Sequence, residues 1–479
     1  MEERPLVGRT LHFIGIGGAG MSGLALVTSA LGARVTGSDR SDSSYCARLR
    51  AAGIEPVIGH DAANVPEGAE VVVSTAIPDD NPELAAARAA GARIVHRGDL
   101  LGELSRMKRT IAIGGTHGKT TSAAMAAHAL RETGRSPAFL IGGELRAARA
   151  NAGWGEGEWA VIEADESDRS FLKLAREVAV VTNVDLEHHA TYRSLRELER
   201  VFAEFLEPAG VRVVGPGVEL PGVSGAVTFG LEAGSLRAEG LELLPGGSRF
   251  VVDGAEVELR VPGRHNVLNA LAALAACRPA GLSPAEAAPA LAGFTGAARR
   301  FEEHGRTASG ALVYDDYAHH PTEVRATLEA GRTLGPARLV ACFQPHLYSR
   351  TRKLAREFGR ALSVADLVVV LDVYPARERA EDFRGVTGLL VAGATADAAG
   401  GRPVWWLPGM DDAERMLRGE LREGDLLVTL GAGDVDLLAR RLVGRGARTE
   451  ATGGAAAGVE AGGAAPATAG GTAPAEAQQ

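Results

Sequence analysis

The chain has 479 residues, of which 46% are hydrophobic and 23% charged, the composition of an ordinary globular protein. The net charge of −9 gives no reason to expect nucleic acid or an anionic membrane as a partner. The three cysteines have no metal-type spacing, and no apolar run approaches the length of a membrane span, which excludes a disulfide scaffold and a helical membrane protein. We expect a cytoplasmic protein of roughly two to four domains.

A glycine-rich turn follows the first predicted strand, residues 10–14. The turn is Gly15-Ile-Gly-Gly-Ala-Gly20, a helix is predicted directly after it, and a second strand ends in Ser38 and Asp39. This is the dinucleotide fingerprint, in which a diphosphate lies over the turn at the N-terminus of a helix. The pattern predicts a bound nucleotide diphosphate but does not say which one.

Two further strands are predicted, at 71–73 and 92–96. Ser74 and Thr75 follow the earlier of these strands in a loop of small residues. In an open parallel sheet, ligands bind at the carboxyl ends of the strands. Ser74 and Thr75 are therefore either simple turn residues or part of a ligand loop.

A second glycine loop, Gly114-Gly-Thr-His-Gly-Lys119, connects an apolar strand to a helix predicted for 122–131. Backbone N–H groups of such a loop surround phosphate oxygens, the lysine reaches the outer phosphates, and Thr120 can hold Mg²⁺. Only three residues separate Gly114 from Gly118, one fewer than in the common P-loop. The chain has only four lysines among 51 basic residues, so a lysine at this position favours phosphate binding over a chance turn.

Acidic clusters follow the next two predicted strands, 159–164 and 178–182. The clusters are 163–168 (EADESD) and 183–192, which ends in a His-His-Ala-Thr-Tyr sequence. Because the ends of parallel strands share one edge of a sheet, both clusters can meet the phosphate loop there. Carboxylates with one imidazole suit a phosphate-bound Mg²⁺, so metal binding is favoured over two solvated loops.

The stretch 211–261 has short alternating apolar runs and is predicted to be a β-meander. A helix begins after it, with Asn266 and Asn269 three residues apart and hence on one helical face. These two side chains either contact a purine or phosphate, or Asn266 serves as a helix cap.

Beyond a predicted junction at 293–302, strands and helices alternate again. Strands are predicted at 311–315, 338–343, 367–371 and 425–430, and polar residues gather after the first three. His319 and His320 in one of these clusters raise the question of a metal site. No third ligand is suitably spaced in the sequence, so contact with a substrate is favoured.

The last segment, 446–479, consists mainly of Ala, Gly, Thr, Pro and Glu and lacks Leu, Ile and aromatic residues. Such a segment buries too little apolar surface to offset the entropy lost on ordering. We expect it to be disordered and without function. The predicted domains are 1–106, 107–297 and 298–445.

Eight motifs in this order resemble the Mur ligases: HFIGIGGAGMSG, GTHGKTT, EADESD, TNVDLEHHATY, GRHNVLNA, RRFE, DDYAHHPTE and FQPHLYSRT. The resemblance runs from about residue 10 to residue 440, and the short phosphate loop is this family's form. It implies an α/β protein with a Rossmann-like UDP-binding domain, a central P-loop-type ATPase domain and a C-terminal Rossmann-like domain that binds the amino acid.

The resemblance implies an ATP-dependent ligase of peptidoglycan precursor synthesis, with ATP and Mg²⁺ as cofactors. It would add L-alanine to the lactyl carboxylate of UDP-N-acetylmuramate through an acyl phosphate. The implied partners are these small molecules, with no nucleic acid and no membrane insertion, and the expected state is a monomer or weak dimer.

The site residues that the resemblance implies fall into groups. The catalytic group is Lys119, Glu163, His188, Arg300 and Asp316, and the metal ligands are Thr120, Glu163 and His188. The ATP-binding group is Gly114, Gly115, Thr116, His117, Gly118, Lys119, Thr120, Thr121, Asn266 and Asn269. The UDP-sugar group is Gly15, Gly17, Gly18, Gly20, Ser38, Asp39, Ser74 and Thr75, and the amino-acid side is Tyr317, His319 and Arg350.

One position departs from several relatives, which carry a carbamylated lysine as ligand of a second metal ion. No lysine lies between Lys173 and Lys353, and Glu199 stands at the corresponding place. A lysine carbamate is therefore excluded there. Glu199 would bind a second Mg²⁺ either directly or through water.

Other functions remain to be distinguished. A murein-tripeptide recycling ligase shares most of these motifs but usually reads EADEYD where this chain has Ser167. A folylpolyglutamate-synthase-like ligase would lack the first domain. An NAD(P)-dependent oxidoreductase accounts for the first glycine turn but gives Lys119 no role, and a nucleotide switch leaves the first domain unexplained.

Overall fold

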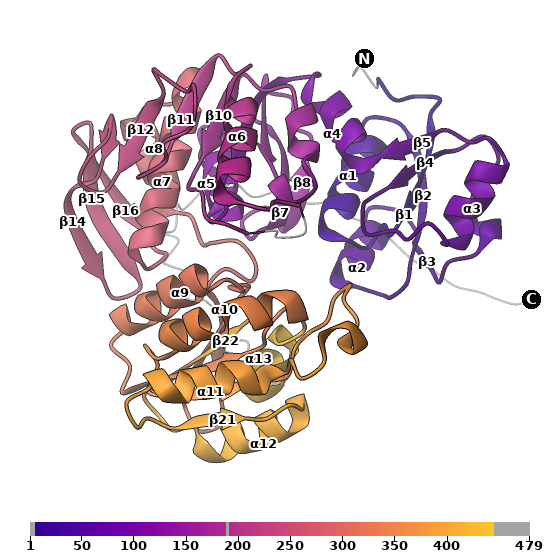
Figure 1. Ribbon diagram of the computed structural model, residues 1–479. Coiled ribbons are helices and arrows are strands. Elements are labelled where there is room, and N and C mark those ends of the chain that lie inside the picture. Colours follow the sequence, from indigo (N-terminus) through magenta and orange to yellow (C-terminus); the bar gives the residue numbers. More distant parts are fainter. Residues whose placement is uncertain (1–4, 188–190, 445–479) are drawn as a thin grey trace, which may run out of the picture.

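The structure, a computed structural model, describes residues 5–187 and 191–444, which form four sheets with helices around them (Figure 1). The segment 446–479 and His188 lie outside the described residues. Within the described ranges, no helix is both long enough and apolar enough to cross a membrane. The α/β fold class predicted from the sequence is confirmed.

The first sheet is five-stranded and parallel, in the order β3-β2-β1-β4-β5. Its strands are β1 (Thr10–Ile14), β2 (Arg34–Asp39), β3 (Val57–Ile58), β4 (Glu70–Val73) and β5 (Ile94–His96). The helices are α1 (Ala19–Ala30), α2 (Ser44–Ala51), α3 (Pro82–Ala89) and α4 (Arg97–Ser105). The strand order reverses beside β1, so the glycine turn after β1 lies at the switch point where ligands of such sheets bind.

The second sheet has eight strands in the order β13-β12-β11-β10-β6-β9-β7-β8. They are β6 (Arg109–Gly114), β7 (Ala138–Leu145), β8 (Ala150–Gly153), β9 (Trp159–Glu163), β10 (Val178–Val181), β11 (Val211–Val214), β12 (Val227–Gly230) and β13 (Leu236–Arg237). Helices α5 (Lys119–Glu132), α6 (Leu195–Leu206), α7 (Arg264–Cys277) and α8 (Pro284–Ala292) accompany it. All four residues of β10 are buried, as expected for a strand covered on both faces.

The predicted β-meander at 211–261 is only partly correct. Strands β11, β12 and β13 extend the second sheet in parallel, and only β14 (Glu239–Leu244), β15 (Gly247–Val252) and β16 (Ala255–Leu259) form an antiparallel meander. Val213 and Val214 are buried because they lie between neighbouring strands of the large sheet. Short apolar runs alone do not distinguish the two arrangements.

The last sheet has the order β17-β18-β22-β19-β20-β21, in which only β17 is antiparallel to its neighbour. Its strands are β17 (Glu302–Arg306), β18 (Leu312–Asp316), β19 (Arg338–Phe343), β20 (Leu367–Val370), β21 (Val404–Trp406) and β22 (Asp425–Leu430). The helices are α9 (Pro321–Thr333), α10 (Tyr348–Leu362), α11 (Gly388–Ala398), α12 (Met410–Glu420) and α13 (Asp436–Val443).

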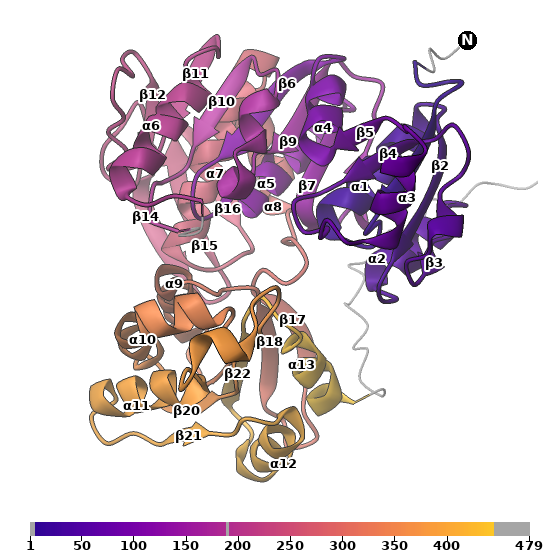
Figure 2. The same ribbon diagram turned by 45° about the vertical axis from the view of Figure 1, so that its right-hand side comes forward.

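The second of the three predicted domains contacts both of the others. The first packs on the second through α1, which contacts β7 and β8, and the third approaches the second through α9, which contacts α7 (Figure 2). The domain that carries the phosphate loop is thus in contact with the first domain through β7 and β8 and with the third domain through α7. The domain boundaries at 106 and 297 stay predictions.

Candidate functional site

Three neighbouring strands deliver the predicted motifs to one edge of the second sheet. Strand β6 lies between β10 and β9, with Gly114 opposite Val181 and Ile113 opposite Glu163. The phosphate loop and both polar clusters therefore begin at the same level. The predicted convergence of these three strand ends is confirmed for the described residues.

The phosphate loop is held open by backbone geometry and hydrogen bonds. Gly118 has a φ of +80° and caps α5, which starts at Lys119, three residues earlier than predicted. A Cβ on Gly118 would collide with Oδ1 of Asn269. The amide of His117 donates to Oδ1 of Asn183 at 2.8 Å, which joins the loop to the end of β10. The N-terminus of α5 is thereby fixed as a site for an anion.

Lys119 is mostly buried, and oxygen atoms surround its ammonium group. Its Nζ donates to the carbonyl oxygens of Gly115 at 2.7 Å and Thr116 at 3.0 Å, and lies 3.0 Å from Oε2 of Glu166. Burial would lower the pKa of Lys119, but the nearby acidic residues, Glu166 first, raise it above its ordinary value. Lys119 is therefore a permanent cation inside the loop.

Two of the three predicted metal ligands lie side by side. Thr120 Oγ1 donates to Oε1 of Glu163 at 2.9 Å, and the amide of Gly142 donates to Oε2 at 2.6 Å. Arg300 reaches the same hydroxyl from the third domain, with Nη2 3.2 Å from Thr120 Oγ1. A hydroxyl beside a carboxylate is a donor set that fits Mg²⁺. The third predicted ligand, His188, lies outside the described residues.

A cavity of about 390 Å³ lies next to the loop, between the second and third domains. Asn266 and Asn269 line it, and the Asn269 amide donates to Oδ1 of Asn266 at 3.1 Å. Asn266 does not cap α7, because Gly263 holds that position, and its own amide donates to the carbonyl of Pro262. The apolar part of the wall includes Phe229, Val261, Leu268, Phe294 and Phe301. An apolar cavity with a few polar groups beside a phosphate loop is suited to a nucleotide base.

Arg300 and Asp316 meet where the third domain reaches this cavity. Asp316 accepts hydrogen bonds from the amides of Phe301 at 2.8 Å and Ala318 at 2.7 Å. Burial raises the pKa of Asp316 to about 6, although the charge of Arg300 acts in the opposite direction. The guanidinium carbon of Arg299 lies 5.1 Å from the ring centroid of Tyr317, and that of Arg300 lies 5.2 Å from it.

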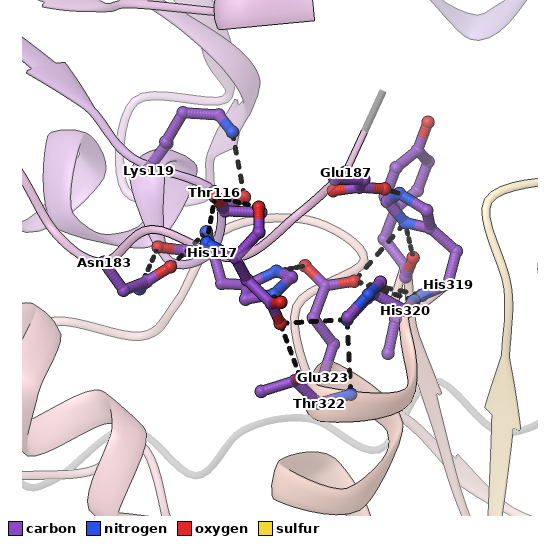
Figure 3. A network of polar contacts seen from close by, with 12 residues as sticks. Thr116, His117, Lys119, Asn183, Glu187, His319, His320, Thr322 and Glu323 are labelled. Carbon is purple, nitrogen blue, oxygen red and sulfur yellow. Dashed lines mark hydrogen bonds and ion pairs between the residues drawn. The ribbon is translucent and has the colours of Figure 1, made fainter. Parts of the chain in front are cut away.

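The predicted amino-acid side forms a separate group on the third domain. Arg350 is buried, and its Nη2 donates to Oε1 of Glu187 at 2.6 Å. His319 Nε2 lies 3.3 Å from the same oxygen, and the ring of Tyr317 lies edge-on to His319. These three predicted residues are therefore together, with the carboxylate of Glu187 in their midst. Figure 3 shows Glu187 and His319 near each other.

The predicted UDP-sugar residues divide into two kinds. Asp39 supports the glycine turn, because it accepts from the amide of Gly17 at 2.9 Å, and a Cβ at Gly17 would lie 2.7 Å from Cys46 Sγ. Ser38 is buried, and its hydroxyl donates to Glu83 at 2.5 Å. Thr75 is exposed and Ser74 half-buried at the end of β4. The remaining glycines, Gly15, Gly18 and Gly20, lie in or beside the turn at the start of α1.

Sequence reasoning did not identify Arg97 and Glu187. Arg97 on α4 lies 2.9 Å from Asp168 and 3.3 Å from Asp165, so it joins the first domain to the acidic motif. A Cβ on Gly20 would lie 3.3 Å from Nη1 of Arg97, which places this cation beside the glycine turn. Glu187 lies within a motif that was recognised, but its partner Arg350 is 163 residues away, and no local pattern reports such a pair.

Profiles of the Mur ligase family match most of the chain. They are described as Mur ligase family, catalytic domain, over residues 10–109, Mur ligase middle domain over 113–277, and Mur ligase, glutamate ligase domain over 299–433.

Individual relatives match along nearly the whole length. The UDP-N-acetylmuramate–L-alanine ligase of Streptomyces coelicolor is 46% identical over 451 residues, which are 90% of this chain and 96% of that protein. The solved UDP-N-acetylmuramate-alanine ligase MurC from Thermotoga maritima has a TM-score of 0.80 at 31% identity and covers 91% of this chain and 98% of its own. A murein peptide ligase from Psychrobacter arcticus has a TM-score of 0.66 at 25% identity, with 91% and 98% covered. The chain therefore belongs to the Mur ligase family.

Proposed function

We propose that this chain is an ATP-dependent UDP-N-acetylmuramate–L-alanine ligase of peptidoglycan precursor synthesis. Identity of 46% to a relative of that name, over 90% of the chain, supports the substrate assignment. One structural observation supports the chemistry most directly: Lys119, Thr120 and Glu163 share one sheet edge, and Arg300 of the third domain reaches it. Phosphoryl transfer requires this concentration of positive charge and oxygen ligands.

In the proposed reaction the lactyl carboxylate attacks the γ-phosphorus of ATP, and ADP leaves. Lys119, at the start of α5, is proposed to neutralise charge on the transferred phosphoryl group, and the amides there are proposed to bind its oxygens. Thr120, Glu163 and His188 are proposed to hold Mg²⁺, which when bound would neutralise further negative charge on the phosphates. Asn266 and Asn269 are proposed to face the nucleotide in the adjoining cavity.

In the second half-reaction the amine of L-alanine attacks the acyl phosphate. The new C–N bond forms as the C–O bond to phosphate breaks, the amine loses a proton, and inorganic phosphate leaves. Arg350 is proposed to bind the alanine carboxylate, because it already binds the carboxylate of Glu187 at 2.6 Å. Tyr317 and His319 would complete that pocket.

The glycine turn after β1 is proposed to bind the diphosphate of UDP, with Asp39 supporting the turn. Ser38 supports the same region indirectly through Glu83. Cytoplasmic location follows from the proposed use of ATP. A monomer or weak dimer remains our expectation for the state in solution.

Measurement of phosphate release with each substrate omitted in turn tests this function. Release should require ATP, UDP-N-acetylmuramate and L-alanine together, and the amide product should appear in equal amount. Replacing L-alanine by the murein tripeptide tests the recycling ligase. Faster product formation with the tripeptide would overturn the proposed substrate, whereas an NAD(P)H absorbance change without phosphate release would overturn the reaction class.

A further inference from the structure

Two imidazoles and a carboxylate meet where the second and third domains touch. His117 belongs to the phosphate loop, Asp185 follows β10, and His320 immediately precedes α9. Their potential ligand atoms all lie within 4.8 Å of one another. His117 Nε2 is 3.3 Å and His320 Nδ1 is 3.6 Å from Oδ2 of Asp185. Figure 3 shows the side chains of His117 and His320 near each other.

These separations match a small coordination sphere. Zinc–nitrogen bonds of about 2.0–2.1 Å at tetrahedral angles place neighbouring ligand atoms roughly 3.4 Å apart. The distances of 3.3 Å and 3.6 Å to Asp185 bracket this value. Two nitrogens with one oxygen suit Zn²⁺ or Co²⁺, whereas Mg²⁺ prefers oxygen ligands throughout.

The surrounding contacts are those of an outer coordination shell. The second ring nitrogen of His117, Nδ1, faces Oε1 of Glu323 at 3.3 Å, and metal-bound histidines normally give their other N–H to a carboxylate. Thr322 Oγ1 donates to Oδ2 of Asp185 at 3.0 Å and orients it.

We propose that His117, Asp185 and His320 form a binding site for a four-coordinate transition-metal ion of the Zn²⁺ type, in addition to the Mg²⁺ site proposed at Thr120 and Glu163. The fourth position is taken by water. Because His117 and Asp185 come from the second domain and His320 from the third, the ion fastens the two domains together. His117 and Asp185 also line the nucleotide cavity, so bound metal slows turnover.

The binding test uses Co²⁺ added to the untagged full-length chain in excess Mg²⁺, with no nucleotide present. Four-coordinate Co²⁺ gives intense visible bands that six-coordinate Co²⁺ does not. The test variant is His320→Asn, because an asparagine side chain can accept the hydrogen bond from the Thr322 amide that His320 Nδ1 accepts in the metal-free chain. The matched control is His304→Asn, on β17 of the same domain.

The wild type and His304→Asn should show intense visible bands that saturate at one Co²⁺ per chain. The affinity of His320→Asn for Co²⁺ should be at least about 10-fold weaker. Asp185→Asn, which keeps an acceptor for Thr322, should weaken Co²⁺ similarly and serves if His320→Asn does not fold. Weak six-coordinate spectra, or equal affinities in all variants, would mean an adventitious ion only and overturn the site. This readout needs no substrate, so its failure is separable from failure of the proposed function.

The proposed effect of the metal ion on turnover is tested separately. Zn²⁺ should inhibit phosphate release by the wild type at saturating ATP and Mg²⁺, and the concentration for half inhibition should rise at least about 10-fold in His320→Asn. Equal inhibition of both proteins would overturn this part of the proposal even if Co²⁺ binding is confirmed.

Discussion

Lys119 is the residue on which the proposed phosphoryl transfer depends most. Its Nζ lies within 3.1 Å of three oxygen acceptors inside the loop, so it is held in place before any phosphate arrives. Lys119→Ala should reduce acyl phosphate formation by roughly 10³-fold or more, because it removes the lysine cation proposed to neutralise charge on the transferred group. Rapid-quench measurement of ADP formation checks this.

The matched control for that variant is Lys173→Ala. Lys173 pairs with Asp99 and its side chain is half exposed, so its loss should leave ADP formation within about twofold. Unchanged melting of Lys119→Ala would show that the fold survives. Retained turnover in Lys119→Ala would contradict the assignment of the loop.

Glu83 is a buried anion beneath the proposed UDP site, and it predicts a pH effect on stability. Burial would raise its pKa, but hydrogen bonds with His12, Ser38 and Asn64 outweigh burial and lower the pKa to about 2. A carboxylate with a lowered pKa stabilises the fold above its unfolded pKa of 4.5, and this contribution is lost as the pH falls toward 2.

Glu83→Gln should therefore lower the free energy of unfolding by up to about 3 kcal/mol near pH 7, and by progressively less below pH 4.5. Urea unfolding of both proteins across this range checks the expectation. A difference that stays constant with pH would show that packing, rather than charge, is what the substitution removes.

At the scale of single elements, Gly118, which caps α5 in the left-handed conformation, is the position in the site where a substitution should have the most specific effect. Gly118→Ala combines a strained φ with a collision against Asn269, whereas Gly134→Ala has a similar φ of +76° and nothing within 4 Å of the new Cβ. Both should lose about 1 kcal/mol or more of stability. Only Gly118→Ala should lose ATP binding, measured by calorimetry. Equal ATP affinities would show that the loop tolerates a shifted Asn269.

The buried parallel strands were the elements easiest to predict from the sequence. Strands β1, β19 and β22 have the predicted bounds, because each is a short apolar run with clear ends. Strand β17, Glu302–Arg306, was not predicted, since it contains no apolar residue and is held by pairing with β18. Its structure depends on tertiary contacts that local sequence does not report.

Within the site, residues that follow neighbouring parallel strands were predicted to meet, whereas contacts that depend on the docking of the third domain were not. Thr120 and Glu163 were assigned to one metal and lie in contact. The approach of His320 to His117 depends on how the third domain docks, so spacing in the sequence gave no third ligand for the histidine pair. Ser38 was predicted at the ligand, and that role stays a prediction; its hydroxyl is buried and donates to Glu83, a contact that the sequence did not indicate.

At the scale of the whole molecule, buried contacts join the second and third domains. Glu187 and Arg350 form a buried ion pair across this junction, and removing the charge of one member leaves the other poorly compensated. Glu187→Gln should therefore raise the radius of gyration of the nucleotide-free chain, measured by X-ray scattering. Glu329→Gln is the control, because it changes an exposed pair on α9.

An ATP analogue with Mg²⁺ should return Glu187→Gln to the wild-type dimensions, since nucleotide in the cavity contacts both domains. Identical scattering of the two variants without nucleotide would mean that other contacts hold the domains together.

The proposed acyl phosphate is tested most directly with UDP-N-acetylmuramate labelled with ¹⁸O in the lactyl carboxylate. If that carboxylate attacks the γ-phosphorus of ATP, one of its oxygens leaves with the phosphate when L-alanine attacks. Mass spectrometry should find the released phosphate carrying a single ¹⁸O and the amide product retaining the other. Unlabelled phosphate, with both ¹⁸O atoms accounted for elsewhere, would contradict the account.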